Sequence, residues 1–216
     1  MIRTLVLKEL RESLPIVAVA GLAIAFILVQ LCGLSFFAFF GYGGAMLPFI
    51  ADAFWKWVAI IGIPFAIFLA LKQTQWEEMK GTYRYLLFRP VDRKQFFLWK
   101  IIVGLSLLTC SMAIAIVAYG LWATLPGRHA SPFYWSMTVP SWHAWFVLPV
   151  MYSAAFLCGV RPGRWFGSKL LPLAGASMLA LLLLAQPWPW IALVGSVIAT
   201  ALYASVAIDV VRSRDY

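Results

Sequence analysis

The sequence predicts an all-α fold: a single membrane domain, residues 1–216, built as a bundle of six transmembrane helices. The 216 residues are 63% hydrophobic and 12% charged, whereas soluble domains are about half apolar and about a quarter charged. Uncharged runs of near-spanning length recur along the chain, and a spanning helix needs about 20 residues. The apolar composition excludes a disordered chain, and three cysteines are too few to hold a chain of this length as a disulfide scaffold.

The first element, residues 1–13, has the pattern of an amphipathic helix. Ile2, Val6, Leu10 and Leu14 recur every four residues, and charged side chains fill the rest of the helical wheel. Such a helix can lie in the membrane interface with its basic residues toward lipid headgroups. The alternative is that these residues are only the charged start of the first crossing.

Six segments are predicted to cross the membrane: 14–40, 57–71, 101–125, 144–160, 170–186 and 191–208. The second is short, and the turn before it adds Asp52 and Lys56, which at a spacing of four can pair on one helix face. Pro132 and Pro140 punctuate the chain before the fourth segment. Pro187 and Pro189 cannot lie inside one continuous helix, so a tight turn is predicted between the last two segments. A signal peptide is disfavoured, because its apolar region is about 7 to 15 residues long.

The distribution of positive charge orients these crossings. An even number of crossings places both termini on one side, and 15 of the 17 Lys and Arg residues then fall on that side. Only Lys56 and Arg128 remain for the other side. Since cytoplasmic loops carry the excess of Lys and Arg, the sequence predicts a multi-pass protein of the cell membrane with both termini cytoplasmic. Most of the net charge of +9 is therefore a signal of orientation and does not indicate nucleic-acid binding.

Residues typical of catalysis or cofactor binding are missing from the predicted membrane segments. No crossing has an ionisable residue near its middle, which argues against a proton relay. His129 and His143 lack the spacing of a known metal motif, so an incidental pair is favoured over a metal site. Residues 163–169 do not meet the spacing of a phosphate-binding Walker A loop. We expect no enzyme active site, cofactor or metal in this chain.

The longest predicted cytoplasmic segment, residues 72–100, has one apolar stripe. Its residues, at helical spacing, are Trp76, Met79, Tyr83, Leu86 and Leu87. Gly81 interrupts the helix and Pro90 ends it, and Asp92 with Gln95 forms a capping-box pattern that begins the next helix. The pattern predicts a helical elbow that docks on a partner. The alternative is a stripe that only rests on the membrane surface.

This segment resembles the cytoplasmic loop of type-2 ABC transporter permeases. That loop carries an acidic residue, Gly-Thr, a leucine pair, Pro with a following basic residue, and Lys at the start of the third helix. The matching residues here are Glu77 and Glu78, Gly81 and Thr82, Leu86 and Leu87, Pro90 and Arg93, and Lys100. The six crossings, the N-terminal interfacial helix and the length also fit, but the short connection between the last two crossings departs from branches with a large extracellular domain.

The resemblance implies a permease subunit that moves substrate while a separate cytoplasmic subunit hydrolyses ATP. Two permease chains, identical or different, would pair, and the loop would pass closure of the ATPase to the helices. The expected coupling residues are Glu77, Glu78, Gly81, Thr82, Leu86, Leu87, Pro90 and Arg93. The resemblance also implies an exporter, and the scattered polar groups of the crossings favour a lipid-like, amphiphilic or drug-like cargo. Alternatives are a lipid-modifying membrane enzyme, a non-catalytic assembly factor and a haem-export-type membrane subunit.

Overall fold

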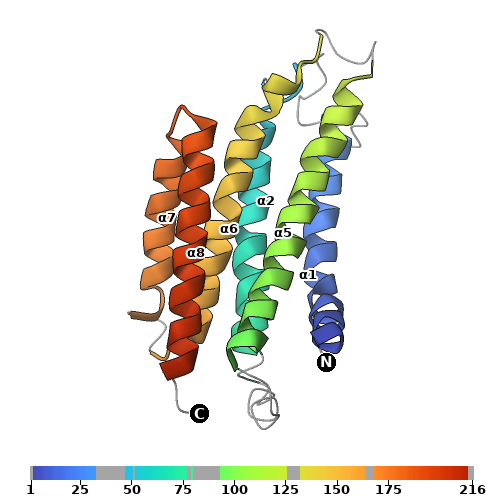
Figure 1. Cartoon of the computed structure of the whole chain (residues 1–216). Coiled ribbons are helices and arrows are strands. Elements are labelled where there is room, and N and C mark those ends of the chain that lie inside the picture. The colour runs from blue at the N-terminus through green and yellow to red at the C-terminus, as the bar shows by residue number, and fades with distance from the viewer. Residues whose placement is uncertain are drawn as a thin grey trace.

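A computed structural model of the chain describes residues 2–32, 47–50, 52–76, 79, 93–125, 132–163 and 168–213. These residues form helices joined by turns, without a strand among them. The elements are α1 (Ile2–Leu31), α2 (Phe54–Leu71), the π-helix η2 (Lys72–Trp76), α5 (Arg93–Ala123), the short 3-10 helix η3 (Trp135–Thr138), α6 (Val139–Val160), α7 (Leu171–Leu184) and α8 (Pro189–Ser213). The helices lie side by side in one bundle (Figure 1). We call the end where α1 begins and α8 ends the termini end, and the opposite end the far end.

Five of these helices are long and apolar enough to cross a membrane. They span Thr4–Leu31, Phe54–Trp76, Lys94–Ala123, Trp135–Val160 and Pro189–Ser213. The predicted fifth crossing, 170–186, corresponds to α7, which has only 14 helical residues. At about 1.5 Å per residue α7 is roughly 21 Å long, which is less than the roughly 30 Å of a hydrocarbon core. The helical bundle with several apolar spans is confirmed, and α7 is shorter than the prediction.

The N-terminal residues do not form a separate helix. α1 runs unbroken from Ile2 to Leu31 and contains Pro15, so residues 2–13 are continuous with the first crossing, and their position in the membrane interface stays a prediction. Leu10 and Leu14 of the predicted apolar stripe are exposed, while Glu9 is buried. Leu10 and Leu14 therefore face away from the bundle, whereas Glu9 packs inward, where it finds a partner.

Helix α6 forms the centre of the bundle. It packs most extensively against α2 and α8, and it also contacts α5 and α7. Every residue from 150 to 160 is buried. The approach of α2 is close at Gly62, where an added Cβ would lie 2.8 Å from the Leu148 side chain. A helix enclosed on all sides needs no polar face, which explains why α6 has no amphipathic pattern.

Several predicted helix ends are confirmed. α5 begins at Arg93, directly after the predicted cap. A tight turn joins α7 to α8, with the Gln186 N–H donating to the Leu183 carbonyl at 3.3 Å, and Pro189 begins α8. Pro140 does not precede the fourth crossing but lies in the first turn of α6. Proline is tolerated there because a first-turn N–H has no acceptor within the helix.

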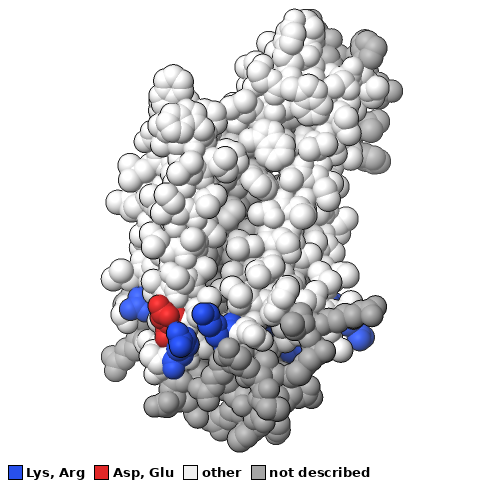
Figure 2. Space-filling view, viewed as in Figure 1, with Lys and Arg blue, Asp and Glu red and all other residues white. Residues whose placement is uncertain are grey.

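Positive charge gathers at the termini end of the described bundle. On the face shown in Figure 2, the coloured charged side chains lie in one band at that end. The Lys and Arg residues concerned lie at the start of α1 and α5 and at the end of α2, α6 and α8. Lys56, on the first turn of α2, is the exception among the described residues. The one-sided distribution predicted from the sequence therefore holds for this part of the chain.

The predicted pair between Asp52 and Lys56 is wrong. Asp52 lies in the turn before α2, and its Oδ1 accepts the Phe54 N–H at 3.1 Å. Lys56 instead places its Nζ 5.7 Å from the centroid of the Trp55 ring. A spacing of four residues brings side chains together only when both residues are helical, and Asp52 precedes the helix.

Candidate functional site

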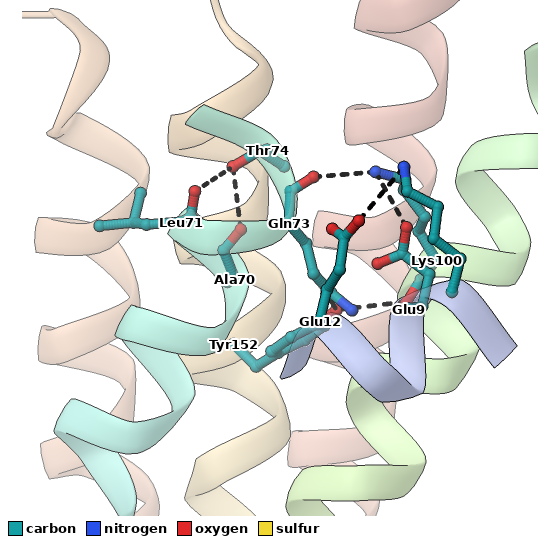
Figure 3. Close-up of polar contacts among 9 residues, drawn as sticks. Glu9, Glu12, Ala70, Leu71, Gln73, Thr74, Lys100 and Tyr152 are labelled. Carbon is teal, nitrogen blue, oxygen red and sulfur yellow. Dashed lines mark hydrogen bonds and ion pairs between the residues drawn. The ribbon is translucent and has the colours of Figure 1, made fainter. Parts of the chain in front are cut away.

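The clearest polar site of the bundle lies at the termini end, where four helical segments meet. It consists of Glu9 on α1, Gln73 in η2, Lys100 on α5 and Tyr152 on α6, and we call it the Lys100 cluster. All four side chains are buried. Figure 3 shows Glu9 and Lys100 pointing toward each other, with the α1 segment that carries Glu9 running across the direction of the neighbouring helices.

Lys100 is the centre of this cluster. Its side chain is fully buried, and its Nζ lies 3.3 Å from Oε1 of Glu9. The same ammonium donates to the backbone carbonyl of Gln73 at 3.1 Å. It also lies 5.1 Å from the centroid of the Phe96 ring. The carboxylate and the carbonyl together compensate a charge that would otherwise be costly to bury.

Tyr152 connects the cluster to the central helix. Its hydroxyl donates to Oε1 of Gln73 and lies 3.5 Å from the carbonyl oxygen of Lys100. The phenol fits because residue 104, one turn after Lys100, is glycine. A Cβ at Gly104 would lie 2.0 Å from the Tyr152 hydroxyl oxygen and 2.6 Å from Oε1 of Gln73. Space for this polar contact therefore depends on a missing side chain in α5.

The π-helix η2 fastens the end of α2 to α6. Thr74 donates its hydroxyl to the Ala70 carbonyl at 2.9 Å, and Gln75 donates from Nε2 to the Gly159 carbonyl at 2.7 Å. A Cβ on Gly159 would lie 1.8 Å from the Thr74 hydroxyl oxygen. π-Helical turns are rare and often occur at functional sites. Here the turn directs Gln73 toward Lys100 and Gln75 toward α6.

Most of the predicted coupling residues lie outside the described residues. This applies to Glu77, Glu78, Gly81, Thr82, Leu86, Leu87 and Pro90. Arg93 is the first residue of α5, and the structure describes its backbone only. Trp76 and Met79, from the predicted apolar stripe, are exposed, Met79 by 80%. The segment's two ends are thus described, and its centre stays a prediction.

Of the members of the Lys100 cluster, the sequence pattern singles out Lys100 alone. Because α5 begins directly after the predicted cap at Asp92, Lys100 lies two turns inside this helix. A lysine with apolar neighbours on both sides in a helix signals a nearby acidic partner. That signal could not select Glu9 among the several acidic residues predicted on the same side, because the choice depends on how α1 crosses α5.

The remaining candidate residues do not form a second chemical site. Cys32, Cys110 and Cys158 are not joined by disulfides, and they lie apart, after α1, on α5 and on α6. His143 packs edge-on against Phe146, and His129 lies outside the described residues. In the part of the chain that the structure describes, no three His, Cys, Asp or Glu residues come together as metal ligands.

The chain was compared with family models, curated proteins and solved structures, and none of them matches it. The resemblance to type-2 permeases therefore stays a prediction that depends on the loop residues themselves.

Proposed function

We propose that this chain is the membrane-spanning permease subunit of an ATP-driven ABC transporter, and that residues 72–100 dock on a separate ATPase subunit. One observation carries the proposal beyond the sequence. The Lys100 cluster joins the two ends of that segment, since the Lys100 ammonium donates to the Gln73 carbonyl at 3.1 Å. A docking loop that transmits force needs stems that move together, and this contact supplies such a connection.

The contacts of the Lys100 cluster also indicate which helices a movement of the loop would displace. Besides the two stems, it includes Glu9 on α1 and Tyr152 on α6. A displacement of the loop would therefore reach α1, α2, α5 and the central helix α6 through direct contacts. Rigid elements joined by short polar contacts can pass a movement of one segment to several helices.

Within this proposal the chain crosses the membrane six times, with α7 as the fifth crossing and both termini in the cytoplasm. The packing of α7 against α8 as an antiparallel pair supports the count of six crossings (Figure 1). The positive charge at the termini end supports the cytoplasmic position of both termini (Figure 2). The short α7 would cross where the bilayer thins or where flanking residues extend the span. The membrane is the cell membrane, and two permease chains would pair around the substrate path.

The exposed side chains at the start of the loop support docking on a protein. Met79 and Trp76 are large and apolar, and Met79 is 80% exposed. An apolar helix face in a groove of a partner, ringed by charges, is a common mode of recognition. Glu77, Glu78 and Arg93 would be the nearby charges that fix the register. The transported molecule would be lipid-like or amphiphilic and would leave the cell.

The direct test is assembly with an ATPase. The chain would be purified in lipid nanodiscs from cells that also express a candidate ATPase with a Walker A loop. We expect a stable complex that hydrolyses ATP. Met79→Glu should weaken the complex at least about tenfold, since a charge would enter an apolar groove. Leu125→Glu, at the far end, is the matched control and should leave assembly unchanged.

A second variant separates docking from transport. Charge reversal of Glu78 combined with a bulky residue at Gly81 should leave membrane insertion intact while ATP hydrolysis no longer drives export. Wild-type export by this double variant would contradict the assignment of the loop. A chain that purifies alone and never binds an ATPase would contradict the proposed function itself.

A further inference from the structure

A second buried polar contact lies at the far end, where the turn before α2 meets α5. Oδ1 of Asp52 accepts the Phe54 N–H at 3.1 Å, and Oδ2 accepts the hydroxyl of Tyr119. Asp52 is 9% exposed and Tyr119 is 2% exposed. One carboxyl group therefore caps the start of α2 and holds the end of α5 against it.

This carboxyl group has no positive partner in the described part of the chain. Lys56 is the nearest cationic residue in sequence, and its ammonium lies over the Trp55 ring. The surroundings of Asp52 are aromatic. Phe49 and Phe54 place their ring centroids 4.7 and 4.8 Å from that of Tyr119, and Trp122 stacks on Tyr119 at 5.6 Å. A carboxylate in such surroundings is costly unless it carries a proton.

The turn that holds Asp52 is strained. Phe49 and Ala53 adopt left-handed backbone conformations, with φ values of 65° and 48°. Residues with a Cβ rarely adopt this conformation, which persists only where surrounding contacts enforce it. The carboxyl-phenol contact and the packing of Phe49 are two of the contacts that enforce it, beside the hydrogen bond from the Lys56 N–H to the Ala53 carbonyl at 2.8 Å. Weakening of the carboxyl-phenol contact would therefore allow the turn to relax.

Protonation of Asp52 controls the cost of keeping its carboxyl group buried in this turn, because an ionised carboxylate loses its hydration there. Burial raises the pKa of the Asp52 carboxyl above its ordinary value of 3.8, although hydrogen bonds from Tyr119 and from backbone N–H groups act in the opposite direction. We call the turn closed when Asp52 contacts Tyr119 and open when the Asp52 carboxyl is hydrated. The closed turn therefore binds a proton more tightly than the open turn would. Between 3.8 and the raised pKa, the closed turn loses stability as the pH increases. Cys32 and Tyr119 are the other titratable side chains of this described cluster, and Lys56 is the nearby cation.

We propose that Asp52 and Tyr119 form a proton-dependent latch that holds the far ends of α2 and α5 together and releases them as Asp52 loses its proton. The latch does not depend on the proposed transport function, because its groups lie at the opposite end from the Lys100 cluster. In a membrane protein it would make opening of this end sensitive to the pH of the compartment it faces.

Cys32 provides a native reporter of the latch. It follows α1, is partly buried and packs against the cluster around Asp52 and Tyr119. In a Cys110→Ser, Cys158→Ala background it is the single thiol. The test measures how fast a membrane-impermeant thiol reagent labels Cys32 in lipid nanodiscs as the pH is raised from about 4, the ordinary range of an aspartate carboxyl, to about 9.

The matched comparison is Asp52→Asn, which keeps the shape of the side chain and cannot ionise. The labelling rate of the wild-type background divided by that of Asp52→Asn, at equal pH, cancels the ionisation of the thiol itself. We expect this ratio to rise at least about threefold with pH. A charged Asp52 would by itself disfavour the Cys32 thiolate and lower the ratio, so electrostatics alone cannot produce the expected rise.

Tyr119→Phe removes the phenol and keeps the ring. It should accelerate labelling about tenfold at low pH, because a hydrogen bond to the buried carboxyl is lost. Asp209→Asn, an exposed residue near the end of α8, should match the wild-type background at every pH. A ratio that stays flat with pH overturns the latch. The comparison with Asp52→Asn decides this even where Tyr119→Phe does not fold.

Discussion

The two ends of this bundle bury polar groups in opposite ways. At the termini end the Lys100 ammonium is paired with the Glu9 carboxylate, and four segments share the contact. At the far end the Asp52 carboxyl is buried among aromatic rings, with a phenol and backbone N–H groups as partners. A compensated charge fixes an arrangement, whereas an uncompensated one makes the arrangement depend on protonation. The first end is therefore suited to transmitting a movement, and the second to responding to its surroundings.

The largest effect should come from breaking the ion pair of the Lys100 cluster. Glu9→Gln leaves a buried ammonium without its carboxylate and should lower the free energy of unfolding by about 3 to 5 kcal/mol. Denaturant unfolding in detergent micelles measures this change. Glu12→Gln is the control, because the partly exposed pair of Glu12 with Lys8, at 3.8 Å, should contribute about 1 kcal/mol or less.

A compensating variant shows whether the pair itself causes that loss. Adding Lys100→Met to Glu9→Gln should recover most of the stability, since apolar replacement of a buried pair is often neutral. If Glu9→Gln and Glu12→Gln lower the free energy of unfolding equally, the burial of the Glu9–Lys100 pair does not determine the stability of this end.

The second prediction concerns the space that admits Tyr152. Gly104→Ala places a Cβ against the Tyr152 hydroxyl and should cost about 1 to 3 kcal/mol of stability, as overpacking generally does. Gly21→Ala on α1, where nothing lies within 4 Å, should instead be neutral or stabilise by up to about 1 kcal/mol. Thermal unfolding of both variants measures the contrast. If Tyr152→Phe fails to rescue Gly104→Ala, the clash is not with the hydroxyl.

The third prediction tests the far end by stability alone. Because the pKa of Asp52 is raised, the wild-type protein should lose stability as the pH rises above 3.8, by up to about 1.4 kcal/mol for each pH unit within the titration. Asp52→Asn should remove this part of the pH dependence. Unfolding of both proteins at a series of pH values measures the difference. If the free energy of unfolding has the same pH dependence in both, the burial of Asp52 does not make the far end sensitive to pH.

The smallest effect is expected at Lys56. Since Lys56 contacts Trp55 and not Asp52, Lys56→Gln should change the pH dependence of Cys32 labelling by less than about twofold. Labelling of that variant beside the wild-type background provides the measurement. A large shift in the pH midpoint of Cys32 labelling would instead indicate that Lys56 forms the ion pair with Asp52 that the helical spacing suggested.

How far the sequence could predict this protein differs between its helices and its sites. The start of α5 and the turn before Pro189 follow from capping and proline chemistry, which are local. The helix α7 is shorter than the predicted segment 170–186, and α1 is continuous through Pro15, which the sequence left open. The length of α7 and the continuity of α1 depend on how neighbouring helices cover these segments, which cannot be predicted from apolar composition.

The sequence by itself determined that the chain is a helical membrane bundle with its positive charge at one end, because apolar length and charge position act through the bilayer and not through specific contacts. Only the tertiary structure decided that Glu9 is the partner of Lys100 and that Tyr119, not Lys56, is the partner of Asp52. The reason is geometric. A buried polar group takes the partner that the crossing helices bring within about 3 Å, and that partner was 91 residues away from Glu9 and 67 from Asp52.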